Sequence, residues 1–244
     1  MGKEFALELI PEFALKLLSY LPTTLVILTV GISLGIVIGL LLAIPRIYRV
    51  PVLNVLAYLF ISYCRGTPIL VQLFIAYFGL PQLLLIVGLD LSRVEPIYFV
   101  TVAYGLSWGA LMSENIRASI ASVDQGQIDA AHALGMTSFD AFRRVIIPQA
   151  LVVALPNFAN LVFMALKGTS LAYAVGVHEI LFRVNSLGSA LNHFFEAYLA
   201  AAIIYYAIYL ILAKLFAGAE RQVGSYMLGT EKRSVARRRI WRTG

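Results

Sequence analysis

QIDAAHALGMTSFDAFRRVIIPQA, residues 127–150, is the longest stretch of this chain that is too polar for lipid and still has the pattern of an ordered helix. Apolar residues recur at helical spacing from Ile128 to Leu134, and Gly135 supplies a residue that tolerates a left-handed stop. Thr137-Ser138-Phe139-Asp140 then has the S/T-x-x-D form of a capping box. The stretch therefore predicts two short helices joined by a glycine turn, set between hydrophobic segments.

The second of these helices places Phe139, Phe142 and Ile146 on one side and two arginines on the other. Pro148 must break or restart it, because proline lacks the backbone donor that a continuing helix needs. An amphipathic connector lying on the membrane surface accounts for this periodicity as well as an ordered docking element does.

Composition places most of the chain in lipid. Of its 244 residues, 60% are hydrophobic and only 13% are charged, and the mean hydropathy is +0.84. A soluble domain carries about a quarter charged residues. The single cysteine, Cys64, excludes an internal disulfide and a cysteine-based zinc site, and is expected to be a small buried hydrophobe. His132, His178 and His193 are too dispersed for a metal site, so no metal is expected.

About five transmembrane helices are expected, each near the 20 residues that a bilayer requires. Residues 1–21 predict an amphipathic surface segment instead. Leu80 to Leu89 is too short to span and predicts an outer-face loop or short helix, and Ala172 to Leu191 predicts a re-entrant or surface segment. The predicted spans are 22–46, 51–78, 96–116, 148–171 and 196–216.

Orientation follows from the positive-inside rule. Of the 19 Lys and Arg residues, 13 fall in cytoplasmic segments if the N-terminus lies outside, four fall in outer segments and two within spans. This arrangement puts residues 127–150 and the C-terminus in the cytoplasm. The tail from Glu231, with its three consecutive arginines, is interpreted as an unstructured anchor to anionic headgroups, and binding of RNA or a partner is the alternative.

Two groups of polar residues interrupt the predicted spans. Arg65, Thr67 and Gln72 lie within RGTPILVQ, where a glycine and a proline can interrupt the helix and let polar groups face a cavity. Lys167 and Ser170 lie within LKGTSL, near the end of the fourth predicted span. Arg65 can instead pair with a neighbouring helix, and Lys167 can be a simple interfacial lysine.

Residues 127–150 resemble the "EAA" loop of ABC importer permeases. The similarity rests on Asp129-Ala130-Ala131, Leu134-Gly135-Met136 and Ile147-Pro148-Gln149-Ala150, with Asp129 where the family usually has Glu. It implies a coupling loop over residues 124–150 that docks into a groove of a separate ATP-hydrolysing subunit. The coupling residues implied are Asp129, Ala130, Ala131, Gly135, Met136, Phe142 and Pro148.

RGTPILVQ, LKGTSL and Ser113-Glu114-Asn115-Ile116-Arg117 resemble signatures of the polar amino acid branch of these permeases, which serves histidine-, glutamine-, arginine- and cystine-type uptake. The resemblance implies an all-α integral membrane protein with the architecture of a type I importer permease, in the cell membrane. Residues 22–220 are expected to form the permease domain and residues 221–244 a basic cytoplasmic tail. Gly168 departs from the acidic or amide residue of many relatives and resembles cystine-type members.

A substrate site is expected between the second, third and fourth spans. Arg65, with Thr67 and Gln72 beside it, is the first candidate for the carboxylate of an amino acid, followed by Lys167 with Ser170. Glu114 is the last candidate, for the ammonium group, since it can instead pair with Arg117 one turn on. Because Gly168 brings no charge, the expected substrate has an uncharged or polar side chain.

The chain is not expected to be an enzyme. It has no G-x-x-x-x-G-K-[ST] motif and no intramembrane pair of acids or of serine and histidine. The resemblance to ABC importer permeases implies that ATP and Mg²⁺ are bound by a dimer of a separate ATPase subunit. The other expected partners are a second copy or paralogue of this chain, an extracytoplasmic amino-acid-binding protein and the lipid bilayer, but no nucleic acid. A stand-alone secondary transporter or channel for amino acids or amines is the alternative, although five spans do not divide into two equal repeats.

Overall fold

The computed structural model describes the backbone of residues 5–240 and the side chains of residues 5–225. Within residues 5–240 the chain is all-helical and has no strand, as the sequence predicts. It divides into two compact units, one of residues 1–114 and 161–210 and the other of residues 115–160 and 211–244. Three helices contribute residues to both units, namely α6 (Pro96–Ala121), α9 (Ile147–Gly168) and α11 (Phe194–Ile240).

The first unit contains most of the apolar helices. Besides its parts of the three shared helices, it consists of α1 (Leu9–Leu18), α2 (Leu21–Ile47), α3 (Pro51–Gly66), α4 (Ile69–Phe74), the π-helical turn η1 (Ile75–Gly79), α5 (Leu80–Ile86), the 3₁₀ segment η3 (Thr169–Val175) and α10 (Ile180–Leu191).

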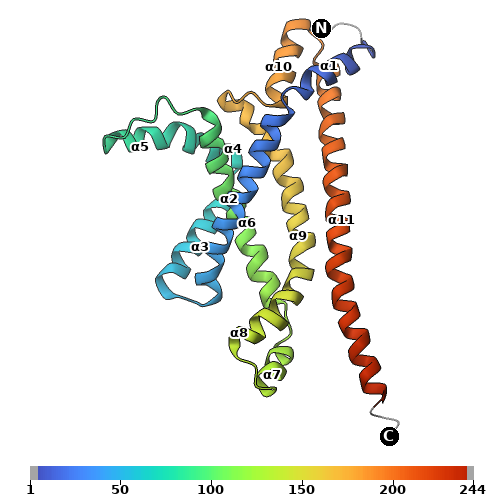
Figure 1. Ribbon diagram of the computed structural model, residues 1–244. Helices are drawn as coiled ribbons and strands as arrows, with labels where there is room; N and C mark the ends of the chain where they lie inside the picture. The colour runs from blue at the N-terminus through green and yellow to red at the C-terminus, as the bar shows by residue number, and fades with distance from the viewer. Residues whose placement is uncertain (1–4, 241–244) are drawn as a thin grey trace. The chain divides into compact units, whose positions relative to one another are not determined.

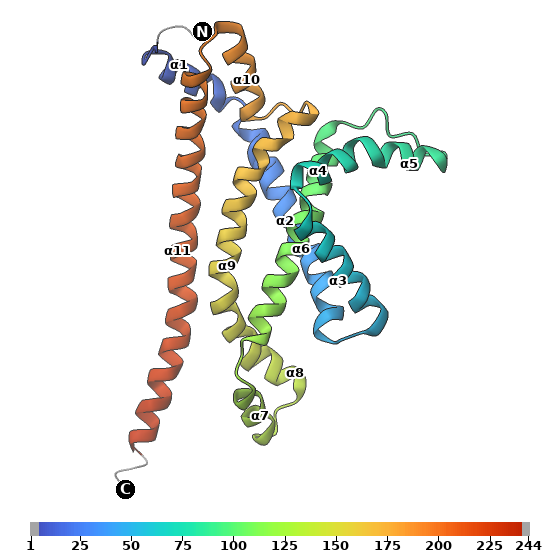
Figure 2. The ribbon, with the colours of Figure 1, turned by 180° about the vertical axis from the view of Figure 1, so that it is seen from behind.

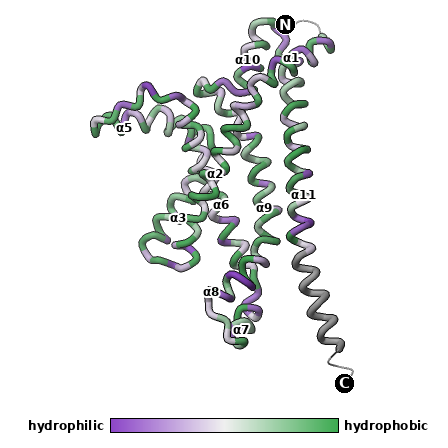
Figure 3. The backbone as a smooth tube through the Cα atoms, in the orientation of Figure 1, coloured by the Kyte–Doolittle hydropathy of each residue, from purple (hydrophilic) through white to green (hydrophobic). Residues whose placement is uncertain are grey.

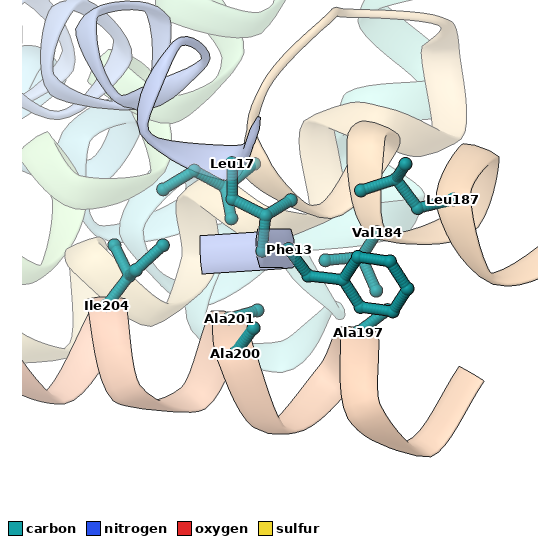
Figure 4. Close-up of a cluster of buried hydrophobic side chains, with 9 residues drawn as sticks. Phe13, Leu17, Val184, Leu187, Ala197, Ala200, Ala201 and Ile204 are labelled. Carbon is teal, nitrogen blue, oxygen red and sulfur yellow. The ribbon is translucent and has the colours of Figure 1, made fainter. Parts of the chain in front are cut away.

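The amphipathic helix α1 packs across α10 and the beginning of α11, and these three lie side by side in both views (Figures 1 and 2). Phe13 and Leu17 of α1 are completely buried, whereas Glu12 and Lys16 form an exposed ion pair on the other side of the helix. The buried side chains face Val184 of α10 and the alanines of α11 (Figure 4). The predicted amphipathic segment therefore forms a helix whose apolar side packs onto the first unit.

Gly31, Gly35 and Gly39 fall every fourth residue in the sequence, on one helical face, a spacing that predicts close contact with another helix. In the structure they form a glycine seam between α2 and α6. A Cβ atom added at Gly39 would lie 2.7 Å from Cβ of Met112, and one added at Gly109 would lie 2.7 Å from Cγ2 of Ile38. Side chains of α6 thus pack against glycines of α2, and side chains of α2 pack against glycines of α6. The two backbones approach so closely that a single added methyl group has no room.

Four helical segments are long and apolar enough to cross a membrane, where the sequence predicted about five. They are residues 21–47, 69–86, 138–175 and 194–225. The predicted span 51–78 is interrupted, because α3 ends at Gly66 and a new helix begins at Ile69. The predicted span 96–116 does form a helix, α6, but its apolar residues alternate with Gly, Ser, Thr, Tyr and Trp, so it is the less hydrophobic partner of α2.

Two π-helical turns precede prolines inside long helices. Residues Ile75–Gly79 lie just before Pro81, and Phe142–Ile146 lie just before Pro148. In a π turn each N–H bonds to a carbonyl one residue further back than in an α-helix. This shift reduces the number of carbonyl oxygens that lose a hydrogen bond because proline has no N–H. The α-helix does restart at Ile147, as predicted for Pro148, but through a π turn and without a break.

The second unit holds α7 (Gln125–Ala133), α8 (Ser138–Ala141) and the π turn η2 (Phe142–Ile146), together with parts of α6, α9 and α11. Figure 3 shows hydrophilic residues gathered at α7 and α8 and mostly hydrophobic ones along α9. The prediction of an unstructured tail from Glu231 is wrong up to Ile240, because α11 continues through residues of good helix propensity. The predicted headgroup contacts of that tail lie outside the described side chains.

Candidate functional site

The predicted interruption of the second span is present at Thr67 and Pro68. Both residues are extended, with φ −117° and ψ 141° at Thr67 and φ −60° and ψ 137° at Pro68. Arg65 lies in the last turn of α3, where it is exposed and forms no ion pair with any described residue. RGTPILVQ therefore folds as a helix end, a short extended link and a helix start.

Gln72 holds this interruption together. Its side-chain nitrogen donates to the carbonyl oxygens of Cys64 at 2.8 Å and Thr67 at 3.0 Å, and contacts the Thr67 hydroxyl at 2.9 Å. The Thr67 hydroxyl in turn donates to the Tyr63 carbonyl oxygen at 2.8 Å. Carbonyls that the helix end would leave unpaired are thus satisfied within the link, and the amide nitrogen of Gln72 is already engaged.

Lys167 lies in the last turn of α9 and Ser170 at the beginning of η3, and the Ser170 hydroxyl donates to the Lys167 carbonyl oxygen at 2.7 Å. Two cavities meet at Lys167. One of about 290 Å³ is lined by Phe163, Leu166, Lys167, Tyr205, Tyr206 and Tyr209. The other, of about 350 Å³, is lined by Lys167, Ser170, Leu181, Tyr198, Ala201, Ala202 and Tyr205. Neither cavity is lined by Arg65, Gln72 or Glu114, so the six predicted substrate residues divide into separate groups.

Glu114 forms an ion pair with Arg46, a basic residue in the last turn of α2. Its Oε1 accepts a hydrogen bond from Arg46 Nη1 at 2.6 Å, and the two side chains are 23% and 10% exposed. The pair links the end of α2 to α6, next to the glycine seam. The sequence offered Glu114 as a substrate ligand or as the partner of Arg117, and Arg46 was not among the candidates.

Residues 124–150 form the predicted helix-glycine-helix element. Gly135 has φ +81°, the left-handed conformation expected at the end of α7. Its neighbour Met136 donates its N–H to the Ala131 carbonyl oxygen at 3.1 Å. Thr137 caps α8 by accepting from the Asp140 N–H at 3.1 Å and donating to the Asp140 carboxylate at 2.7 Å. α7 packs against α8 and η2, so the element has a defined internal geometry.

The coupling residues predicted by resemblance occupy different places in this element. Asp129 accepts from the Gln125 side chain at 3.0 Å on the exposed side of α7. Ala131 is buried, Phe142 and Pro148 are partly buried, and Ala130 and Gly135 are exposed. Leu134 and Phe139 are 80% and 71% exposed.

A buried carboxylate lies in the segment between the third and fourth candidate spans. Glu179 is completely buried, and burial raises the pKa of its carboxyl to about 7. Its Oε1 caps α10 by accepting from the N–H groups of Leu181 at 2.7 Å and Phe182 at 3.1 Å. Its Oε2 accepts from the Tyr205 hydroxyl at 3.1 Å. Tyr205 lines both cavities at Lys167, so Glu179 is hydrogen-bonded to a residue that forms part of their walls.

The model of the binding-protein-dependent transport system inner membrane component family matches residues 35–223, which is most of the chain. The chain belongs to this family. The permease is 45% identical over 223 residues to the L-cystine transport system permease protein TcyL of Bacillus subtilis (strain 168), covering 91% of this chain and 93% of that protein. It is 41% identical over 226 residues to the probable amino-acid ABC transporter permease protein PatM of Vibrio harveyi, covering 91% and 97%.

The solved structures agree with this assignment. The permease matches the chain of an amino acid ABC transporter crystallised with histidines at a TM-score of 0.80 and 30% identity, covering 90% of this chain and 100% of that chain. The predicted family and all-α membrane architecture are therefore confirmed, and the permease is a non-catalytic, multi-pass membrane subunit.

Sequence reasoning missed Glu179 and Arg46 in the permease. The only local signal for Glu179 is its position directly before the apolar helix in VGVHEIL, and glutamate is not among the residues that are preferred at an N-cap. No comparable local signal marks Arg46. Its partner is 68 residues away on another helix, and it has the position of an ordinary basic residue at the end of a span.

Proposed function

We propose that this permease is the membrane subunit of an ATP-driven amino acid importer whose substrate has an uncharged or polar side chain, with cystine as the leading candidate. The identity of 45% to a cystine permease over nearly the full chain supports the substrate class. The match to an amino acid transporter over the whole of its permease chain supports the mode of transport.

The observation that carries the proposed substrate site is that Lys167 lines both the cavity of about 290 Å³ and the cavity of about 350 Å³, and that no acidic residue is among the lining residues of either. The Lys167 ammonium can pair with a substrate carboxylate, and the Ser170 hydroxyl, whose proton is donated to the Lys167 carbonyl oxygen, can accept a hydrogen bond beside it. Aromatic rings attract ammonium groups and make favourable contacts with sulfur. The rings of Tyr205 and Tyr206 therefore suit the remaining groups of a neutral amino acid, including a disulfide.

Arg65, Thr67, Gln72 and Glu114 have different proposed roles. The bonds of Gln72 and Thr67 favour a structural role at the α3–α4 link, with only the side-chain carbonyl of Gln72 left to contact substrate. Arg65 is exposed and keeps its guanidinium available for a carboxylate. Glu114 is occupied by Arg46, which favours a role in holding α2 and α6 together over binding an ammonium group.

A dimer of a separate ATPase subunit, which binds ATP and Mg²⁺, is proposed to dock on residues 124–150. Leu134 and Phe139 give this element an exposed apolar surface, and the exposed Arg143 and Arg144 flank it. Exposed apolar patches rimmed by polar residues mark protein interfaces. ATP binding favours one arrangement of the helices, and linkage requires the substrate to bias the same equilibrium. A second permease chain and an extracytoplasmic binding protein complete the proposed transporter.

The proposed orientation places the N-terminus outside and both the docking element and the C-terminus in the cytoplasm. Single cysteines at Lys3, Asp140 and Thr243, in a Cys64→Ser background, report it through an impermeant thiol reagent on intact cells. We expect labelling only at position 3. Labelling of position 140 from outside would overturn both the orientation and the docking proposal.

The substrate site is tested in the assembled transporter with Lys167→Gln and Arg65→Gln, measuring uptake and ATPase stimulation by loaded binding protein. Loss of one charged contact costs about 1.5–3 kcal/mol, so we expect Lys167→Gln to lower uptake at least tenfold while basal ATPase activity persists. Lys16→Gln, which removes an exposed lysine of α1, is the matched control and should transport normally. Normal uptake by Lys167→Gln refutes the proposed site.

A further inference from the structure

Glu179 lies in a cluster of buried polar side chains that the proposed substrate site does not use. Its carboxylate accepts three hydrogen bonds, two from the backbone at the start of α10 and one from the Tyr205 hydroxyl. Thr24 of α2 lies close to this carboxyl, and its hydroxyl accepts from the Ile180 N–H at 3.4 Å. A fully buried carboxyl is costly unless its bonds are made, so this degree of satisfaction constrains its position closely.

Groups from several elements of the first unit surround this carboxyl. Thr24 of α2, Tyr104 of α6 and Thr169 of η3 are all completely buried, and Thr169, whose hydroxyl donates to the Leu166 carbonyl oxygen at 2.7 Å, lies close to Tyr205. The Tyr104 hydroxyl is buried without a hydrogen-bond partner among the described residues. Glu179 is therefore the residue that accepts the hydrogen bond of the Tyr205 hydroxyl.

Tyr205 is the aromatic residue that both cavities at Lys167 share. Together with Lys167 it lines the cavity of about 290 Å³ and the cavity of about 350 Å³. Tyr206 lines only the first and Tyr198 only the second. A change in the position of the Tyr205 ring would consequently alter the space beside Lys167 on both sides.

We propose that Glu179 is a positioning residue for the substrate cavities: by accepting the hydrogen bond of the Tyr205 hydroxyl, it fixes the aromatic wall that faces Lys167. The expected effect of Glu179 on transport rests on the proposed function, because it requires that substrate binds beside Lys167. The positioning itself is a property of the permease chain and can be measured without substrate.

The first test measures the reactivity of a cysteine at Ser170, which lines the larger cavity, in the assembled transporter and a Cys64→Ser background. Tyr205→Phe removes only the hydroxyl, and Glu179→Gln keeps a carbonyl oxygen for capping α10 but presents an amide NH₂ in place of one acceptor. Losing one hydrogen bond should change the labelling rate at position 170 about fivefold in each variant. A cysteine at the exposed Ser62 should label equally in all backgrounds. Unchanged rates at position 170 in Tyr205→Phe overturn the proposal.

The second test is a double-mutant cycle on uptake. If Glu179 acts through Tyr205, the double variant should transport no worse than the more impaired single variant, because both remove the same bond. Multiplying defects would overturn the proposal. Tyr98→Phe removes the hydroxyl of an exposed tyrosine in α6, and Glu12→Gln removes an exposed carboxylate of α1; both are the matched controls and should transport normally.

The two proposals fail in different ways. If Lys167→Gln transports normally, the substrate site is refuted, and the labelling rate at position 170 still decides whether Glu179 positions Tyr205. If Lys167→Gln blocks uptake while Tyr205→Phe changes neither labelling nor uptake, the site stands and the positioning role is refuted. Should Glu179→Gln fail to assemble, Tyr205→Phe alone gives the decisive result, because it retains the whole ring.

Discussion

Replacing Gly135 by valine tests whether the angle between α7 and α8 carries the coupling between ATPase and permease. Gly135 has φ +81°, and a Cβ atom added there would meet nothing within 4 Å. The substitution therefore costs backbone strain alone, about 2 kcal/mol for a β-branched residue in the left-handed region. That cost lowers the population of the observed turn about thirtyfold relative to competing conformations. The docking surface should change while the helical spans stay folded.

The assay compares uptake and ATPase stimulation by loaded binding protein in reconstituted transporter. Gly88→Val is a matched control, since Gly88 has φ +84° and equally open surroundings but lies between α5 and α6. Gly135→Asn is a second control, because asparagine tolerates the left-handed conformation. We expect Gly135→Val to lose most stimulated transport and both controls to keep it. Parental coupling in Gly135→Val, or equal loss in Gly88→Val, would refute the reasoning.

Three further predictions concern stability, measured as thermal unfolding of the purified permease. Gly39→Ala should destabilise by about 1–3 kcal/mol through overpacking of the α2–α6 seam, while Gly218→Ala, with open surroundings, should be neutral or slightly stabilising; equal melting temperatures would contradict a tight seam. Arg46→Met or Glu114→Leu alone should cost about 3 kcal/mol and the double change much less, and additive losses would argue against a specific ion pair. Burial raises the pKa of Glu179 from 4.5 to about 7, so between these pH values the folded state retains a proton that the unfolded state releases. The free energy of unfolding should therefore fall by about 3 kcal/mol as the pH rises from 4.5 to 7, and should then level off. This decline should be absent in Glu179→Gln.

Features that depend on residues close in sequence could be predicted without the structure. The left-handed Gly135, the capping of α8 by Thr137 and the helix interruption at Thr67 and Pro68 each follow from the conformational preferences of a few consecutive residues. The apolar lengths likewise indicate a multi-pass helical membrane protein, because a bilayer imposes one requirement on every span. The spacing of three glycines on one helical face was enough to predict a close helix contact, although not which helix makes it.

Tertiary structure decided which polar groups meet. Glu114 with Arg46, and Glu179 with Tyr205, are pairs separated by 68 and 26 residues, and no local rule selects those partners. Sequence reasoning combined Arg65, Lys167 and Glu114 into one site because each is an ionisable residue in an apolar context. In the folded permease Glu114 has its own partner, Gln72 closes the α3–α4 link, and Lys167 lines cavities walled by tyrosines of α11. The physical reason is that successive side chains of a helix point in directions about 100° apart, so they face different neighbouring helices. Only the packing of the helices determines which neighbour each side chain contacts.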